Sequence, residues 1–516
     1  MTPSRQPDTR PAMFRKVLIA NRGEIACRIA GTLHEMGIRS VAVHSEADAG
    51  AMHTRVCDQA VCIGPAEARL SYLDAERIIA VAKATGAEAV HPGFGFLAEN
   101  AAFAEAVEAA GLVFIGPTPQ QIRDMGDKRA ARRIAEAAGA PIVPGAEGAD
   151  AEQLVAAAKK IGYPVMVKAA LGGGGKGMRA VANEAELREA VESAQRLAKS
   201  AFGDASVYLE KLVTNARHIE VQVLGDGAGN AVHLYERECS LQRRHQKVVE
   251  EAPSAAVDAT LRVSMTLAAV RLAEAVQYRG AGTIEMLLSP DGHFYFLEMN
   301  TRLQVEHPVT ELITGIDLVR AQLHVAAFGT LPFEQSAIQR HGHAIEARIY
   351  AEDAASGFLP QAGVASRVRW PHGPFVRVDR GIEAGDEVTV HYDPMLAKVI
   401  AFGANRNDAL ARLSGALDAT RVHGVITNLP FLRALTRAPQ VATAAFDTEW
   451  IEREFLPGFM ALANAPTPDM ALAAAAIAEA MGLGRVTAGS GGAPASAIAT
   501  DAFTALGAWR VSGSAK

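Results

Sequence analysis

The stretch Glu298-Met-Asn-Thr-Arg-Leu-Gln-Val-Glu306 alternates between strongly polar side chains and less polar ones. A period of two predicts a β-strand with one face in a core and the other presented outward. The presented face carries five polar residues, Glu298, Asn300, Arg302, Gln304 and Glu306. We therefore expect a chemical site on this strand.

A second strand precedes this one. Gly282-Thr-Ile-Glu-Met-Leu-Leu-Ser289 is apolar, and Pro290-Asp-Gly-His293 between the two strands is typical of a hairpin. If Asp291 and Gly292 form a two-residue loop, Glu285 lies opposite Glu298, with their Cβ atoms roughly 5 Å apart.

Opposed carboxylates destabilise a sheet unless something lies between them. Oxygen ligands from Glu285, Glu298 and Asn300 suit Mg²⁺ or Mn²⁺ rather than Zn²⁺. The alternative is an exposed polar face with solvated charges. The continuation of the polar row to Glu306 favours a site.

The composition predicts a multidomain chain. Its 516 residues, 49% of them hydrophobic, can bury several cores. A net charge of −6 argues against a nucleic-acid partner, because such surfaces are usually basic. The four cysteines, Cys27, Cys57, Cys62 and Cys239, lack metal-type spacing and are too sparse for a disulfide scaffold. We therefore expect a reducing, cytoplasmic location.

The ends of the chain give no membrane signal. Residues 1–13 are polar without an apolar core, which predicts a disordered leader rather than a signal peptide. The most apolar tract, Met470 to Met481, is Ala-rich, short and interrupted by Glu479. It predicts a helix packed on protein, not a membrane span.

The first folded unit begins with a βαβ pattern. Lys16–Asn21 predicts a strand, Ile25, Ile29 and Leu33 share one side of a helix, and Ser40–His44 predicts a second strand. This pattern is typical of a parallel sheet. Further strands at 87–90 and 112–115 run into glycine-containing loops, where such folds place ligands.

A smaller unit follows the proline-rich connection near Gly145. A strand at 163–168, a glycine loop at 171–179, a helix at 184–200 and a strand at 206–210 are predicted. The glycine loop can wrap phosphate oxygens with its N–H groups, with charge from Lys168 and Lys176. A flexible linker is the alternative, and the loop lacks the P-loop pattern.

A larger unit begins near Arg217. Strands are predicted at 218–224 and 231–236, joined by a turn at Asp226 and Gly227. A basic segment follows, with Arg243, Arg244, His245 and Lys247. On an acidic protein this cluster favours an anion site. Cys239 beside it is interpreted as a buried, inert thiol.

Several motifs together resemble one enzyme family. They are Ile19-Ala-Asn-Arg-Gly-Glu-Ile-Ala26, His91-Pro-Gly-Phe-Gly-Phe96, Met125-Gly-Asp-Lys128, Gly172-Gly-Gly-Gly-Lys-Gly-Met178, Glu238-Cys-Ser-Leu-Gln-Arg-Arg-His-Gln-Lys247 and Glu298-Met-Asn-Thr-Arg-Leu-Gln-Val-Glu-His307. From Phe14 to Leu456 the chain resembles the biotin carboxylase component of biotin-dependent carboxylases. The segment Val388–Lys398 is most similar to acyl-CoA carboxylase α-subunits of the 3-methylcrotonyl-CoA and propionyl-CoA type.

The resemblance implies a mixed α/β and α+β chain with an ATP-grasp fold. It implies an N-terminal Rossmann-like domain, a mobile glycine-rich lid and a C-terminal biotin carboxylase domain. The expected boundaries are a leader at 1–13, the N-terminal domain at 14–127, the lid with its linker at 128–215, the C-terminal domain at 216–458, and a linker with the start of a truncated region at 459–516.

The implied reaction is ATP-driven carboxylation of biotin N1 by bicarbonate through carboxyphosphate. ATP, two ions of Mg²⁺ or Mn²⁺, and biotin as a substrate are the implied small molecules. The resemblance assigns ATP to Lys128, Lys168, Gly174, Gly175, Glu210, Lys211, Leu212, Val213, His218, Gln242 and His245. It assigns bicarbonate to Lys247, Arg302, Gln304 and Val305.

Roles in the chemical step follow from the polar row and the resemblance. Glu306 is the expected general base, Arg302 positions the anion, and Lys247 completes the catalytic set. Arg348 is expected to stabilise the ureido enolate of biotin. The alternative for Arg348 is an ordinary salt bridge to Glu346 or Glu352.

Two other functions are compatible with parts of the sequence. An ATP-grasp amide ligase or carbamoyl-phosphate-type synthetase would share the lid and metals but need an amine pocket. A nucleotide-binding regulatory module would need a lost ligand, and the metal and catalytic residues are all present. Biotin carboxylase is therefore the preferred function.

The expected partners are a biotin carrier domain and a carboxyltransferase β-subunit, in a homo-oligomer without nucleic acid or membrane. The sequence has no Met-Lys dipeptide, the usual biotin attachment site of the family, and no lysine between Lys398 and Lys516. Ala508-Trp-Arg-Val-Ser-Gly513 resembles the start of the domain that joins carboxylase to carrier. We therefore expect no covalent biotin on this chain, and a carrier on another polypeptide.

Overall fold

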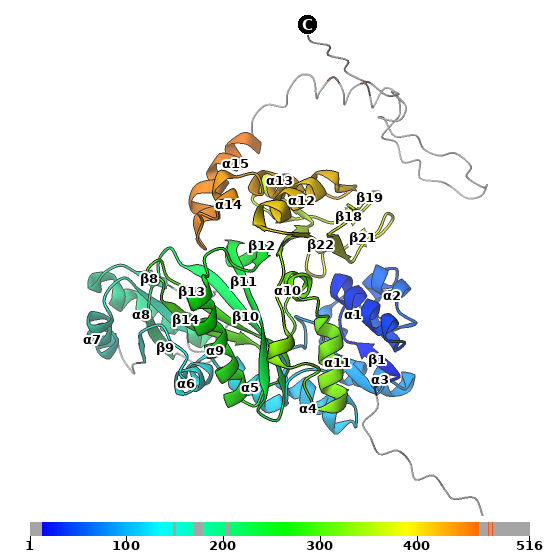
Figure 1. Ribbon diagram of the computed structural model, residues 1–516, viewed down its shortest axis with the longest axis horizontal. Helices are drawn as coiled ribbons and strands as arrows, with labels where there is room; N and C mark the ends of the chain where they lie inside the picture. The colour runs from blue at the N-terminus through cyan, green and yellow to red at the C-terminus, as the bar shows by residue number, and fades with distance from the viewer. Residues whose placement is uncertain are drawn as a thin grey trace, which may run out of the picture. The chain divides into compact units, whose positions relative to one another are not determined.

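The computed structural model describes residues 13–147, 151–169, 179–202 and 206–463, with Ala473 and Ile477. Several predicted features lie outside these described residues: the leader before Met13, the glycine run with Gly174, Gly175 and Lys176, most of the Ala-rich tract at 470–481, and the C-terminal linker. The chain divides into two compact units, residues 1–457 and 458–516. Three larger sheets of the first unit position the candidate site (Figure 1).

The first sheet has five parallel strands in the order β3-β2-β1-β4-β5. They are β1 (Lys16–Ile19), β2 (Arg39–Ser45), β3 (Gln59–Gly64), β4 (Ala89–His91) and β5 (Val113–Phe114). The accompanying helices are α1 (Gly23–Glu35), α2 (Met52–Val56), α3 (Ala75–Thr85), α4 (Ala101–Ala109), α5 (Pro119–Gly126) and α6 (Lys128–Ala137). The predicted βαβ unit and parallel sheet are confirmed.

Two loops at the carboxyl edge of this sheet are tied together. Asn21 follows β1, and its Nδ2 donates to the carbonyl oxygens of Pro92 and Phe94, each 2.7 Å away. Gly93 between them has φ +65°, and a Cβ there would lie 2.9 Å from Asn21 Nδ2. The close approach and the positive φ both require glycine.

The second sheet is antiparallel, in the order β6-β9-β7-β8. Its elements are β6 (Gly145–Glu147), α7 (Ala151–Ile161), β7 (Val165–Ala169), β8 (Arg179–Val181), α8 (Glu184–Phe202) and β9 (Val207–Lys211). Leu154, Val167, Leu187 and Leu209 belong to a core of its own. The predicted strands at 163–168 and 206–210 and the helix at 184–200 correspond to β7, β9 and α8.

The third sheet has eight antiparallel strands in the order β14-β13-β10-β11-β12-β15-β22-β20. They are β10 (Arg217–Asp226), β11 (Ala231–Arg243), β12 (Gln246–Ala252), β13 (Arg279–Leu288), β14 (Phe294–Asn300), β15 (His343–Tyr350), β20 (Val376–Arg380) and β22 (Met395–Gly403). The larger helices are α9 (Ala259–Ala275), α10 (His307–Thr314), α11 (Leu318–Phe328) and α12 (Arg406–Ala419).

Shorter elements complete the described fold. The strands are β16 (Glu352–Asp353), β17 (Leu359–Pro360), β18 (Gly363–Val364), β19 (Arg367–Arg369), β21 (Glu387–Val388) and β23 (Arg421–His423). The helices are α13 (Leu429–Leu435), α14 (Pro439–Ala442) and α15 (Leu456–Ala463), with 3₁₀ or π turns η1 (Glu46–Asp48), η2 (Ala68–Leu70), η3 (Gln335–Ala337), η4 (Ala354–Ser356) and η5 (Ile451–Phe455).

The polar strand ends earlier than predicted. β14 stops at Asn300, residues 301–306 form an irregular turn, and α10 begins at His307. The prediction of one strand up to Glu306 is therefore wrong. The strand ends here because β14 is at the edge of the sheet and the Thr301 N–H donates to Glu99 Oε1, 3.1 Å away, instead of to a neighbouring strand. Pro308, in the first turn of α10, favours the start of a helix.

The hairpin differs from the prediction in two ways that compensate. Ser289 N donates to His293 O at 2.8 Å, which leaves three loop residues instead of the predicted two. Leu297 is an extra residue in β14, because Met286 pairs with Phe296 whereas Glu285 pairs with Glu298. This bulge restores the register. The predicted opposition of Glu285 and Glu298 is confirmed, although the predicted loop is wrong.

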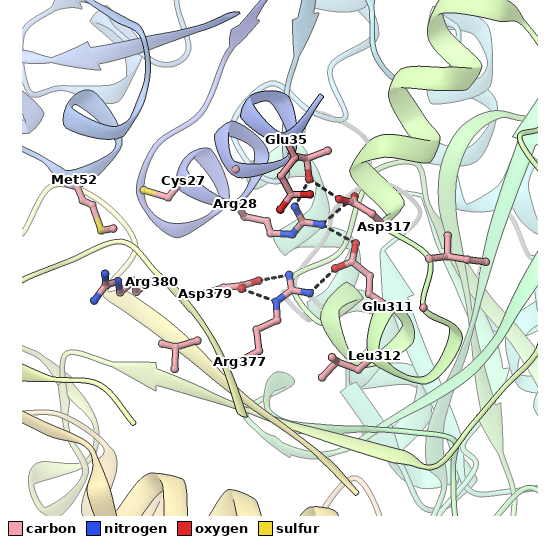
Figure 2. A pocket seen from close by; sticks show the side chains of 15 residues that line it. Cys27, Arg28, Glu35, Met52, Glu311, Leu312, Asp317, Arg377, Asp379 and Arg380 are labelled. Carbon is pink, nitrogen blue, oxygen red and sulfur yellow. Dashed lines mark hydrogen bonds and ion pairs between the residues drawn. The ribbon is translucent and has the colours of Figure 1, made fainter. Parts of the chain in front are cut away.

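Buried ion pairs join the first helix to the large sheet. Arg28 on α1 donates to Glu311 on α10 at 2.8 Å, and Arg377 on β20 donates to the same carboxylate at 2.7 Å. Figure 2 shows these side chains, with Asp317 and Asp379, around a hollow of 550 Å³. Glu311, in the middle of α10, thus links α1 and β20 to the helix that follows the irregular turn.

We predict that Gly381 is essential for this junction. A Cβ at Gly381 would lie 2.6 Å from the backbone nitrogen of Glu24 at the start of α1. Gly381→Ala should lower the free energy of unfolding by about 1–3 kcal/mol, since backbone must move to admit a methyl group. Denaturant unfolding measures the change.

The matched control is Gly415→Ala in α12, where a Cβ meets no atom within 4 Å. Alanine in an open helical position should stabilise the protein by about 0.5–1 kcal/mol. Equal effects of the two substitutions would contradict the assignment of Gly381.

Candidate active site

Two segments contribute the polar residues of the predicted row to the site. Glu298 and Asn300 extend from β14, with Glu298 opposite Glu285 of β13. The irregular turn after β14 contributes the other members, Arg302, Gln304 and Glu306. Glu285, Gln304 and Glu306 are at most 5% exposed. Gln304 and Glu306 are therefore not on a solvated sheet face, whereas 40% of the Glu298 side chain is exposed.

Lys247 on β12 is the centre of a carboxylate cluster. Its Nζ lies 2.6 Å from Glu220 Oε2, 2.8 Å from Glu285 Oε1 and 2.6 Å from Glu306 Oε1. Burial alone would lower the pKa of Lys247, but the three carboxylates raise it well above its ordinary value. The ammonium group therefore stays charged.

Glu285 and Glu306 stay ionised in this cluster. Burial would raise the pKa of each, but Lys247 and His218 hold that of Glu285 well below its ordinary value. Lys247 and Arg348 do the same for Glu306. A carboxylate that is deprotonated at neutral pH can accept a proton, as a general base must.

Arg348 bridges two buried carboxylates. Its Nε lies 2.5 Å from Glu250 Oε1, and its Nη2 lies 2.8 Å from Glu306 Oε2. The alternative pairing with Glu352 is not found, because Glu352 lies 3.5 Å from Arg243. Arg348 therefore contacts the expected general base directly.

Arg302 has partners that the sequence did not suggest. Its Nε donates to Glu99 Oε2 and its Nη2 to Asn300 Oδ1, both at 2.9 Å. The prediction placed Glu306 beside Arg302, whereas the ion pairs of Glu306 are with Lys247 and Arg348. Burial alone would lower the pKa of Arg302, but Glu99 and, to a lesser extent, Glu306 raise it.

The predicted metal ligands fit a divalent cation by charge and chemistry. Burial and the charge of Glu285 raise the pKa of Glu298, so the two opposed carboxylates repel. Lys128 Nζ is 3.7 Å from Glu298 Oε2. Two carboxylates and the amide oxygen of Asn300 supply the oxygen ligands that Mg²⁺ prefers, and its charge would offset the repulsion.

Two other groups of potential metal ligands lie close together among the described residues, His218 with Glu220 and Glu285, and Glu220 with Cys239 and Glu306. His218, Glu220 and Glu285 each offer an atom within 4.8 Å of the others. Lys247 already contacts both carboxylates of this trio. Because Glu285 belongs to both this trio and the predicted set, the ammonium group does not decide between them, and Glu285, Glu298 and Asn300 stay the predicted ligands.

Of the described residues assigned to ATP, Lys168, Glu210 and Lys211 lie on the lid sheet, His218 on β10 and Lys128 at the start of α6. Lys168 on β7 and Glu210 on β9 form an ion pair. Lys211 donates its Nζ to two backbone carbonyls, 2.8 and 2.9 Å away, so its side chain secures the lid. Leu212 and Val213 follow β9. His218 on β10 lies 3.1 Å from Glu285 and connects this region to the cluster.

The predicted basic patch does not form one surface. Lys247 enters the carboxylate cluster, whereas Arg243 lies 4.0 Å from the centre of the Phe358 ring. Arg244 and His245 form an exposed turn, because β11 ends at Arg243 and β12 begins at Gln246. Gln242 is buried beside Lys247.

Burial raises the pKa of the Cys239 thiol well above its ordinary value, which supports the interpretation of this thiol as inert.

A cavity of 420 Å³ opens beside the cluster. Arg302, Val305 and Arg348 line one side, and the N-terminal loops line the other with Arg22 and Phe94. The Val305 carbonyl accepts a bond of 2.8 Å from Lys398. The cavity has room for a small bicyclic ligand next to Arg348.

Sequence reasoning missed four charged residues of this site. They are Glu99, Glu220, Arg237 and Glu250. Glu220 shares the alternation of His218-Ile-Glu-Val-Gln222, which could have revealed it. The others carry no local signal, because their partners are distant in the sequence.

Three family models match consecutive parts of the chain. They are the biotin carboxylase N-terminal domain at residues 13–122, the ATP-binding domain of the carbamoyl-phosphate synthase L chain at 127–333, and the biotin carboxylase C-terminal domain at 346–453. Together they cover most of the chain.

Curated relatives are α-subunits of two carboxylases. The mitochondrial methylcrotonoyl-CoA carboxylase subunit alpha of Oryza sativa is 52% identical over 85% of this chain and 60% of its own length. The Mus musculus protein of the same name is 50% identical over 87% and 64%. The propionyl-CoA carboxylase alpha chain of Ruegeria pomeroyi is 48% identical over 90% and 72%. The chain spans less than two thirds of the first two relatives.

Solved structures give the same result. Biotin carboxylase from Campylobacter jejuni matches with a TM-score of 0.82 and 43% identity, over 86% of this chain and 99% of that one. The biotin carboxylase domain of Hydrogenobacter thermophilus 2-oxoglutarate carboxylase, in complex with MgADP, ADP and bicarbonate, matches with a TM-score of 0.82 and 43% identity, over 87% of this chain and 99% of that one.

Among the described helices, none is both long and apolar enough to cross a membrane.

We predict that Lys247→Met destabilises the protein most at neutral pH. In the wild type, the depressed pKa values of Glu285 and Glu306 give stability that is lost as the pH falls through them. Without Lys247 these values rise above those of the unfolded chain, so the variant loses stability as the pH rises. The loss at neutral pH should be about 3–5 kcal/mol, measured by unfolding between about pH 5 and pH 8.

The control is Lys159→Met, which removes an exposed lysine 2.9 Å from Glu184. It should change stability by less than about 1 kcal/mol at any pH in that range. A Lys247→Met effect that does not vary with pH would argue against the charge cluster as its cause.

Proposed function

This chain belongs to the biotin carboxylase family, and we propose that it carboxylates biotin N1 with bicarbonate and ATP as the first half-reaction of an acyl-CoA carboxylase. The observation that carries the proposal is the ionised Glu306 held between Lys247 and Arg348, next to a 420 Å³ cavity. The products would be carboxybiotin, ADP and phosphate.

The nucleotide would lie between the lid and the large sheet. Lys128, Lys168, Glu210 and His218 are the proposed ATP contacts among the described residues, and Gly174 and Gly175 stay predicted contacts. Glu285, Glu298 and Asn300 would hold Mg²⁺ or Mn²⁺. When bound, the metal supplies positive charge to the transferred phosphoryl group.

Bicarbonate would bind among Lys247, Arg302, Gln304 and the backbone of Val305. Glu306 would take a proton as the bicarbonate oxygen attacks the γ-phosphorus, and ADP would leave. The carboxyphosphate so formed is labile to water, which gives a reason for lid closure.

Arg348 would act in the second step. Carboxyphosphate would break into CO₂ and phosphate, and the phosphate would take the proton of biotin N1, which then forms its bond to the carbon of CO₂. As N1 loses its proton, negative charge develops on the ureido oxygen, and a guanidinium group at the cavity wall can stabilise it. Arg348 Nη2 lies 2.8 Å from Glu306 Oε2. Protonation of Glu306 would remove this competing charge and leave Arg348 free to pair with the enolate.

The runner-up is an ATP-grasp synthetase that acts on an amine. The match of residues 127–333 to a carbamoyl-phosphate synthase ATP-binding domain favours it. That domain supplies only the ATP site. ATP cleavage that depends on ammonia or an amine, and not on biotin, would identify it.

The proposed partners follow from the named relatives. A biotin carrier domain would present biotin to the cavity, and a carboxyltransferase would use the carboxybiotin. Homo-oligomerisation and a cytoplasmic location stay predictions.

We predict that the wild type cleaves ATP in a bicarbonate-dependent way and carboxylates free biotin slowly. Arg348→Ala should reduce biotin carboxylation by about 100-fold or more, while bicarbonate-dependent ATP cleavage falls much less. Phosphate release and ¹⁴C-bicarbonate fixation measure the two activities. Equal losses would contradict the division of roles, and a wild type without either activity would contradict the proposed function.

We predict that Glu298→Gln reduces phosphoryl transfer by about 100-fold and raises the Mg²⁺ concentration needed for half-maximal activity. The amide keeps the side-chain shape but removes one ligand charge. Asp291→Asn is the control, since Asp291 lies exposed at the tip of the same hairpin. Unchanged turnover of Glu298→Gln at low Mg²⁺ would remove this residue from the metal site.

A further inference from the structure

Arg237 on β11 lies fully buried behind the catalytic cluster, at 0% exposure. Its five N–H groups have five acceptors: Glu220 Oε1 at 2.5 Å, Gln222 Oε1 at 2.7 Å, Thr310 Oγ1 at 3.0 Å, Thr283 Oγ1 at 3.0 Å and Gln304 Oε1 at 2.8 Å. Each donor of the planar fork is used once. A guanidinium group with every donor engaged has one orientation, and it imposes an orientation on its neighbours.

The first neighbour is Gln304, whose terminal amide could in principle face either way. Its Oε1 accepts from Arg237, and its Nε2 donates to Glu285 Oε1 at 2.7 Å. A flipped amide would place NH₂ against a guanidinium group and oxygen against a carboxylate. Because Arg237 offers only donors and Glu285 only acceptors, the flip is excluded.

The second neighbour is Glu220. One of its oxygens accepts from Arg237 and the other accepts from Lys247 Nζ at 2.6 Å. With both oxygens engaged, Glu220 cannot rotate, and it holds Lys247 at the point where this ammonium also reaches Glu285 and Glu306. Arg237 also offsets one of the three carboxylate charges around Lys247.

We propose that Arg237 is a positioning residue for the bicarbonate site, acting through the amide of Gln304 and through Glu220 on Lys247. The inference rests on the proposed function, in which Lys247 and Gln304 bind bicarbonate. Arg237 itself touches no substrate, because it is buried beneath these side chains.

The principal variant is Arg237→Lys, which keeps a positive charge beside Glu220 but cannot hold Glu220 and Gln304 with one fixed fork. We expect kcat/KM for bicarbonate to fall by about 10- to 100-fold, as for other partners behind a ligand shell. The KM for ATP and the Kd for MgADP, measured by calorimetry, should change less than about 3-fold. If Arg237→Lys weakens MgADP binding as much as it lowers kcat/KM for bicarbonate, the positioning role of Arg237 is overturned.

A double-mutant cycle tests the route through Gln304. Gln304→Ala alone should raise the KM for bicarbonate, and Arg237→Lys combined with Gln304→Ala should lose less than the product of the single losses. Fully multiplicative losses would mean that Arg237 does not act through Gln304, and would overturn the proposal.

Gln304→Glu tests the same contact with Arg237 intact. One oxygen of the new carboxylate can still accept from Arg237. The other oxygen would take the place of Gln304 Nε2, 2.7 Å from Glu285 Oε1, so that two carboxylates would repel each other. A wild-type KM for bicarbonate in this variant would show that the amide orientation is irrelevant, whether or not Arg237→Lys folds.

Thr310→Val is the matched control. Thr310 Oγ1 accepts from the same guanidinium at 3.0 Å, and among the described residues no hydrogen bond joins Thr310 to Lys247 or Gln304. It should lower the unfolding temperature and leave the KM for bicarbonate unchanged. If it reproduces the Arg237→Lys kinetics, Arg237 is only structural. Wild-type activity is measured first, so failure of the proposed function is recognised separately.

Discussion

The site depends on keeping several carboxylates ionised in a buried place. Glu220, Glu285 and Glu306 surround one ammonium, and Arg237 and Arg348 offset charge at the edges of the cluster. Buried ion pairs of this kind contribute little net stability compared with apolar packing, but removal of one partner is costly. The cluster is therefore best understood as a device that fixes protonation states and positions, supported by apolar cores elsewhere.

The irregular turn at 301–306 is held from both sides. Glu99, in the loop after β4, binds Thr301 and Arg302, whereas Lys398 of β22 donates to the Val305 carbonyl. A turn without regular backbone pairing can present side chains in several directions, but it needs such external bonds to keep one conformation. The parallel sheet and the large sheet must dock before the site is complete.

The lid sheet packs around a hydrophobic core of its own. This core includes Leu187 and Leu209, while Lys168 on β7 and Glu210 on β9 form an ion pair. A small unit with its own core can move as a body without disturbing the carboxylate cluster. This separation suits an enzyme that must admit ATP and then exclude water.

The sequence by itself determined most of the strands and helices around the site, because alternation and helical periodicity report which faces are buried. It predicted the opposition of Glu285 and Glu298 correctly, although a three-residue loop and the Leu297 bulge replaced the expected two-residue loop. Only the tertiary structure decided the partners: Arg348 with Glu250 and Glu306, and Arg302 with Glu99. Those pairs join segments from different strands and domains, and no local pattern encodes which buried charge will face which.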